Sequence, residues 1–192
     1  MSVSLKKGGN LNLSKESPGL SKITVGLGWS ARQTFGAAFD LDASAFLLKE
    51  NGRVRGDTDF IFYNQLESTC QSVAHTGDNR TGEGDGDDEA IQVDLDKIPS
   101  AIQRVVFTTT IFDHQSRNQN FGQIEDAYIR VVDEMSGREI ARYDLSEDSS
   151  TETAMIFGEI YRHNGDWKFR AVGQGFAGGL GEMAKNYGVD VE

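Results

Sequence analysis

The residues with the clearest chemical potential form an acidic, glycine-rich segment between Thr76 and Glu89. Six of its fourteen residues are Asp or Glu, and Arg80 is its only basic residue. Calcium is a hard cation that takes about 6–8 oxygen ligands, and alternating glycines allow the backbone to fold tightly around an ion. The segment therefore predicts a Ca²⁺ site, for which the candidate ligands are Asp78, Asn79, Asp85, Asp87, Asp88 and Glu89.

The choice of metal follows from the donor atoms. Oxygen ligands without paired His or Cys favour Ca²⁺ or Mg²⁺ over zinc and copper, and the high carboxylate count favours Ca²⁺. No standard calcium signature is met, since Arg80 stands where an EF-hand loop starting at Asp78 needs its third-position ligand. A solvated acidic loop without a ligand is the alternative that the residues alone leave open.

A second pair of carboxylates lies in an alternating run at Phe39–Leu48. In a strand, Asp40 and Asp42 point to the same side about 7 Å apart, so they are candidates to flank one cation. Asn64 borders the next apolar run and is a further candidate oxygen ligand. The alternative is that Asp40 and Asp42 both face solvent.

Catalytic motifs do not appear in the chain. It has no Gly-x-Ser-x-Gly elbow, no P-loop and no dinucleotide fingerprint, and its three histidines lack metal spacing. His75 adjoins the acidic segment and is best interpreted as a structural residue or as one that orients a ligand. Cys70 is predicted to lie in a strand as a buried, inert thiol. We therefore predict a protein that is not an enzyme.

Composition and charge limit the class of protein. The 192 residues suit a single domain over 1–192. Thirty Asp and Glu against 19 Lys and Arg give a net charge of −11, which disfavours nucleic-acid binding. The single cysteine fits a reducing compartment, and neither a signal peptide nor a membrane-spanning stretch is visible. These features predict a cytoplasmic protein.

Short apolar runs separated by glycine-rich turns predict an all-β fold, a two-sheet antiparallel β-sandwich with short peripheral helices. Turns are expected at 50–53, 135–138 and 163–166, a helical turn at 97–102, a loop at 112–123 and a terminal helix at 180–187. The expected strands are 23–29, 39–48, 59–63, 72–75, 90–95, 104–112, 127–133, 139–145, 153–162 and 167–172.

Several of these strings together resemble the TerD family of tellurium-resistance and general stress proteins. The resemblance runs over nearly the full length, and the acidic segment is its most specific part; the strings are 3–10, 39–48, 62–65, 77–89, 120–123, 141–145 and 159–165. It implies a β-sandwich that binds calcium at one edge. It also implies a cytoplasmic bacterial protein linked to tellurite, phage and colicin resistance.

The expected function is a calcium-dependent binding module in the stress response. Its expected partners are calcium ions, with other tellurium-resistance proteins or an anionic membrane surface as further candidates. Two alternatives stay open: a metal-dependent hydrolase or tellurite-modifying enzyme, and a structural scaffold that assembles with homologues.

Overall fold

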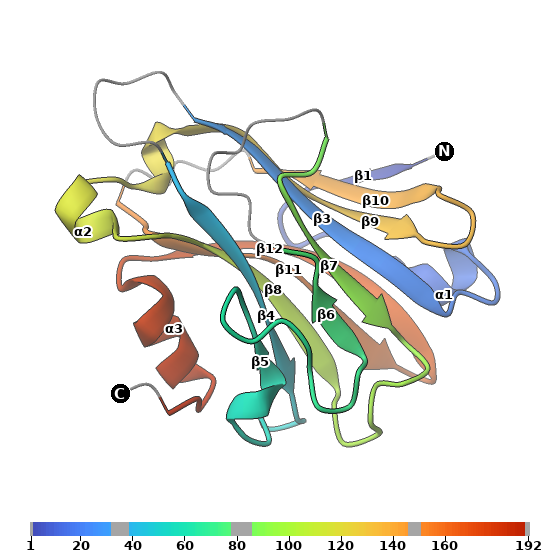
Figure 1. The fold of residues 1–192 in the computed structure, drawn as a ribbon. Coiled ribbons are helices and arrows are strands. Elements are labelled where there is room, and N and C mark those ends of the chain that lie inside the picture. Colours follow the sequence, from blue (N-terminus) through green and yellow to red (C-terminus); the bar gives the residue numbers. More distant parts are fainter. Residues whose placement is uncertain (1, 32–38, 78–85, 146–150, 191–192) are drawn as a thin grey trace.

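The chain folds into two six-stranded sheets packed face to face (Figure 1). The computed structural model describes residues 2–31, 39–77, 86–145 and 151–190. Sheet A has the strand order β1-β10-β9-β3-β7-β6 and sheet B the order β2-β12-β11-β8-β4-β5. The strands are β1 Val3–Leu5, β2 Asn10–Asn12, β3 Lys22–Ala31, β4 Leu41–Leu48, β5 Phe60–Ile61, β6 Val73–His75, β7 Glu89–Asp94, β8 Arg104–Ile111, β9 Ile124–Asp133, β10 Glu139–Asp144, β11 Ala154–His163 and β12 Asp166–Phe176.

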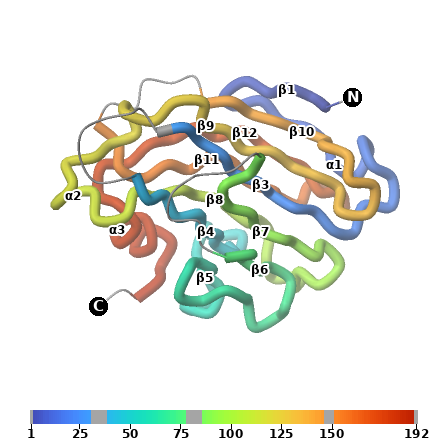
Figure 2. Tube along the Cα trace, turned by 45° about the horizontal axis from the view of Figure 1, so that its top comes forward, coloured from blue at the N-terminus to red at the C-terminus, as the bar shows by residue number. Residues whose placement is uncertain are grey.

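Alternation along the strands builds the core between the sheets. In β3, the side chains of Ile23, Val25 and Leu27 are at most 1% exposed and belong to the same apolar core as Phe107 and Phe169 of sheet B. The sheets also approach each other at one side, where the edge strands β5 and β6 lie next to each other (Figure 2). The predicted two-sheet sandwich is confirmed, and one pair departs from the antiparallel pattern because β1 runs parallel to β10.

The outer face of sheet B is covered as well. Helix α3 (Gly179–Asn186) packs Met183 and Ala184 against Phe46 and Phe60, which form a second apolar cluster. Every residue of β4 is buried, and Asp42 is only 6% exposed. The alternative that Asp40 and Asp42 both face solvent is wrong for Asp42, because the covering of this face cannot be read from the alternation of one strand.

The predicted hairpins are confirmed. β11 pairs with β12 through a tight turn in which Asn164 and Gly165 both have positive φ, 52° and 84°, as a two-residue hairpin turn requires. β9 pairs with β10 around the turn that contains Gly137. The terminal helix is also confirmed, as α3.

Other local predictions are wrong. Cys70 lies in a turn before β6, because Gln71 adopts a φ of 56° and its N–H binds Ser68 O, which interrupts the extended chain. The expected loop at 112–123 contains α2 (His114–Arg117) and the 3-10 helix η2 (Phe121–Gln123). The expected helical turn at 97–102 is not helical.

Two further short elements complete the fold, α1 (Leu13–Glu16) and the 3-10 helix η1 (Asp57–Asp59). Over the described ranges, every helix is too short or too polar to cross a lipid bilayer.

Candidate functional site

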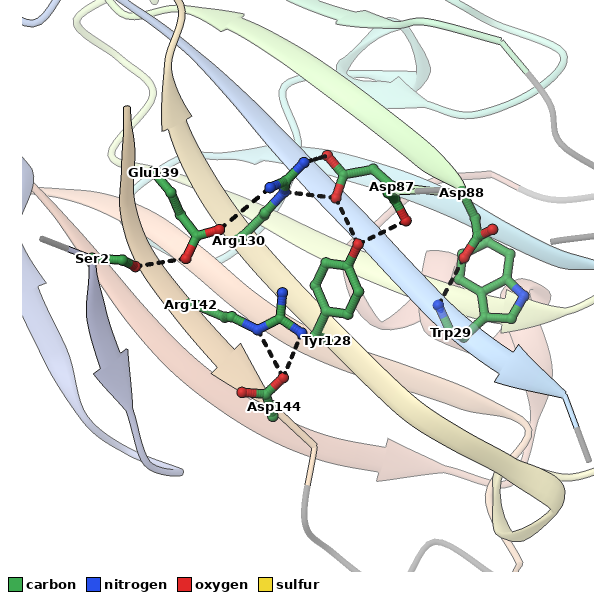
Figure 3. A network of polar contacts seen from close by, with 10 residues as sticks. Ser2, Trp29, Asp87, Asp88, Tyr128, Arg130, Glu139, Arg142 and Asp144 are labelled. Atoms are coloured by element: carbon green, nitrogen blue, oxygen red, sulfur yellow. Dashed lines mark hydrogen bonds and ion pairs between the residues drawn. The ribbon is translucent and has the colours of Figure 1, made fainter. Parts of the chain in front are cut away.

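The acidic segment enters sheet A at the start of β7, and its last three carboxylates take three different directions. Asp87 lies on the outer face of sheet A (Figure 3). Arg130 Nε donates to Asp87 Oδ1 at 2.8 Å, and Arg130 Nη2 donates to Oδ2 at 3.0 Å. The Tyr128 hydroxyl donates to Asp87 Oδ1 at 3.0 Å and lies 2.8 Å from Gly86 O. The charge of Asp87 is therefore already paired.

Two glycines of β3 make room for this arrangement. A Cβ on Gly26 would lie 2.0 Å from Asp87 Oδ2, and a Cβ on Gly28 would lie 2.4 Å from the Tyr128 ring. Because glycine in a strand interior weakens the strand, its presence commonly marks a close approach of another group. Gly26 and Gly28 form the floor on which the Asp87 carboxylate and the Tyr128 ring rest.

The neighbouring side chains hold Arg130 and Tyr128 in place. Glu139 Oε2 accepts a hydrogen bond from Arg130 Nη1 at 3.3 Å, and its Oε1 accepts one from Ser2 Oγ at 2.6 Å. The Arg142 guanidinium lies 3.8 Å from the centre of the Tyr128 ring. Burial raises the pKa of Tyr128 to about 12, assisted by the charge and hydrogen bond of Asp87. The phenol therefore stays protonated and able to donate at neutral pH.

Asp88 turns the other way, toward β3. Its Oδ2 accepts the Trp29 backbone N–H at 2.8 Å, and its own N–H binds Leu27 O at 2.9 Å. Burial raises the pKa of Asp88 above its usual value, and the charges of Asp87 and Glu89 raise it further, against the opposing hydrogen bond from Trp29. The Asp88 carboxylate is thus half-buried in a negative field that a cation would relieve.

Glu89 points into the sandwich, where its side chain is 1% exposed. Its Oε2 accepts the Ala43 backbone N–H of β4 at 2.5 Å, which ties sheet A to sheet B. His75 Nε2 lies 3.3 Å from the same oxygen, while His75 Nδ1 accepts the Gly77 N–H. His75 therefore contacts Glu89 from the neighbouring strand, and whether it orients a metal ligand stays a prediction.

The second group of predicted ligands lies along sheet B. Asp40 is half-buried just before β4, and its carbonyl accepts the Phe112 N–H at 2.8 Å. Asp42 is buried beside Thr110 of β8, and Asn64 is exposed in the turn between Phe62 and Gln65. The hydrogen bond from the Ala43 N–H to Glu89 connects the acidic segment to β4. Asp78, Asn79 and Asp85 lie outside the described residues.

The described residues fit a calcium ion only in part. Within these ranges, no three His, Cys, Asp or Glu side chains gather closely enough to hold a metal. Asp88 fits, because it presents a carboxylate in a negative field. As placed here, Asp87 and Glu89 do not fit, because an arginine and a second sheet already hold them. A complete calcium site would need donors besides these three carboxylates.

Sequence reasoning missed Tyr128 and Arg130, which come from a strand some 40 residues away. The signal that points to them is the Gly26-x-Gly28 pattern inside an otherwise apolar strand. Two such glycines on one face predict that something large packs there, although not which residue.

Fold and site together define a β-sandwich protein in which the last residues of an acidic segment, 86–89, are held against sheet A at the start of β7. The family profile described as "TerD domain" matches residues 1–187, and the chain belongs to the TerD family. It is 62% identical over 190 residues to the tellurium resistance protein TerD of Serratia marcescens, covering 99% of each chain. It is also 52% identical over 192 residues to general stress protein 16U of Bacillus subtilis, covering 100% of each.

A solved structure has the same fold. The crystal structure of a homologue of telluride resistance protein TerD from Streptomyces coelicolor superimposes with a TM-score of 0.71 and 22% identity, covering 86% of this chain and 96% of that one. At this identity the likeness concerns the fold alone.

Proposed function

We propose that this chain is a calcium-binding stress-response protein associated with tellurite resistance, and that it acts by binding other molecules and not by catalysis. The names of its relatives support the stress and tellurium context, since proteins 62% and 52% identical to it are called tellurium resistance and general stress proteins. The proposed compartment is the cytoplasm, which the one free cysteine, Cys70, fits.

The placement of Asp88 carries the calcium proposal. Its carboxylate is half-buried between two other negative charges, and one of its oxygens is held in a fixed direction by the Trp29 N–H. Such a group is destabilised while it is charged and no cation is present, so a divalent ion recovers free energy by binding there. Asp78, Asn79 and Asp85 are the proposed additional ligands; Asp40, Asp42 and Asn64 stay candidates along sheet B.

Calcium binding would change the surface that the protein offers to a partner. The chain carries a net charge of −11, and a divalent cation at the acidic segment lowers the local negative potential. We propose that the loaded edge then binds a second tellurium-resistance protein or an anionic membrane bridged by calcium. Sedimentation with anionic vesicles, and size exclusion with a homologue, each in Ca²⁺ and in EDTA, distinguish these two partners.

Calorimetric titration with Ca²⁺ tests the first step. We expect heat and a higher melting temperature with the wild-type protein, and a clear loss of affinity in Asp88→Asn. Asparagine keeps the acceptor for the Trp29 N–H but removes the charge. Asp96→Asn, an exposed position near the end of β7, is the control and should bind as the wild type does. No heat and no thermal shift in millimolar Ca²⁺ would exclude the proposal.

A further inference from the structure

The contacts around Asp87 form an anchor that needs no metal. We use "Asp87 anchor" for the Asp87 carboxylate together with Tyr128, Arg130 and the floor glycine Gly26. Arg130 holds both carboxylate oxygens, and the Tyr128 hydroxyl lies within hydrogen-bonding distance of Asp87 Oδ1 and Gly86 O. All of its side chains lie on the outer face of sheet A, and Figure 3 shows them converging on Asp87 from β9.

The anchor determines how the chain continues into Asp88. With Asp87 fixed over Gly26, the Asp88 N–H reaches Leu27 O and its carboxylate reaches the Trp29 N–H. The bend at Asp88 ends where β7 begins, and Glu89, its first residue, faces into the sandwich like the other buried positions of that strand. The direction of the Asp88 carboxylate thus follows from the seating of its neighbour.

We propose that Asp87 is an anchor and not a metal ligand, and that Arg130 is a positioning residue that holds Asp88 ready for the cation. This inference rests on the proposed calcium function. Pre-organising a ligand removes the ordering cost that binding would otherwise carry. Removing a partner that orients a metal ligand typically lowers metal affinity about 10–100-fold.

An argument from charge alone predicts the opposite change in Ca²⁺ affinity. Arg130 is a positive charge beside the site, and its side chain is only 31% exposed, so it repels an incoming cation. If charge alone mattered, Arg130→Gln would strengthen Ca²⁺ binding, and it would also free Asp87 as an extra ligand. Whether Arg130→Gln weakens or strengthens Ca²⁺ binding therefore distinguishes a positioning role of Arg130 from the effect of its charge.

The experiment measures two quantities on the full chain. The first is the hydrogen-exchange rate of the Asp88 and Trp29 amides in EDTA, which reports how firmly the anchor holds these two hydrogen bonds without calcium. The second is the Ca²⁺ dissociation constant by calorimetry. The variant is Arg130→Gln, and the charge-matched control is Arg138→Gln, whose side chain binds Glu16 O beyond the far end of the same strand.

We expect Arg130→Gln to speed exchange at both amides and to weaken Ca²⁺ binding about tenfold, while Arg138→Gln changes neither. Unchanged exchange in Arg130→Gln refutes the anchor, and unchanged or tighter Ca²⁺ binding refutes the positioning role. If the wild-type protein takes up no Ca²⁺ at all, the proposed function fails and the positioning role fails with it. The exchange rates then still decide whether the anchor exists.

Discussion

Replacing Gly26 by alanine tests whether the Asp87 carboxylate rests on β3. The new Cβ would lie 2.0 Å from Asp87 Oδ2, 2.2 Å from its Cγ and 2.5 Å from Oδ1. Real Cβ atoms do not approach other atoms so closely, so the carboxylate has to leave Arg130 and Tyr128. In most strand interiors the same substitution is favourable by about 0.5–1 kcal/mol, because alanine loses less backbone entropy than glycine on folding.

The expected cost follows from the bonds that are broken. Two hydrogen bonds from Arg130 and one from Tyr128 each contribute about 1 kcal/mol net, and water recovers part of this because Arg130 is 31% exposed. A loss of about 2 kcal/mol, reduced by the alanine gain, leaves a destabilisation of about 1–1.5 kcal/mol. For a domain of this size that lowers the melting temperature by about 2–6 °C.

The assay is thermal and urea unfolding in EDTA, with Gly56→Ala as the matched control. Gly56 has an extended backbone with φ of −175°, and a Cβ there would meet nothing within 4 Å, so its replacement should leave stability within about 0.5 kcal/mol. The double variant Gly26→Ala with Arg130→Gln should be less destabilised than the sum of its parts, because both changes remove the same contacts. A Gly26→Ala protein as stable as the wild type would show that the carboxylate does not rest there.

Glu89, Asp88 and two buried tyrosines carry the remaining predictions. Glu89→Ala should cost about 1–3 kcal/mol in urea unfolding, because it leaves the buried Ala43 N–H of the other sheet without its acceptor. A change below about 0.5 kcal/mol would contradict that link. Asp88→Asn should stabilise the metal-free protein at pH 7, because the raised pKa of Asp88 means that the folded state disfavours its charge. This gain should vanish well below pH 4, where the wild-type carboxyl is also neutral. Equal stability of the two proteins at pH 7 would refute the prediction. Burial raises the pKa values of Tyr128 and Tyr187 to about 12, so their contribution to stability is complete below pH 10 and is lost as the pH rises toward 12. Tyr128→Phe should make stability less dependent on pH in that window. An unchanged slope would refute the raised pKa of Tyr128.

Local patterns predicted the strands well where alternation and turn chemistry agree. The runs that became β3, β8, β11 and β12 are dense in β-branched and aromatic residues, and the Asn164-Gly165 turn has the conformational freedom that a hairpin needs. The failures are places where a single torsion decides the outcome. One left-handed residue, Gln71, was enough to remove Cys70 from the expected strand.

The sandwich, the acidic segment and the expectation of a hard cation could be predicted from residue order, because these depend on the types and spacing of neighbouring residues. Residue order did not determine which carboxylates are available to an ion. Asp87, Asp88 and Glu89 look alike in the sequence, yet one is held by Arg130, one remains in a negative field and one joins the two sheets. Their different roles come from the fold, because their partners lie on distant strands, and a carboxylate's availability depends on the charges and hydrogen bonds around it.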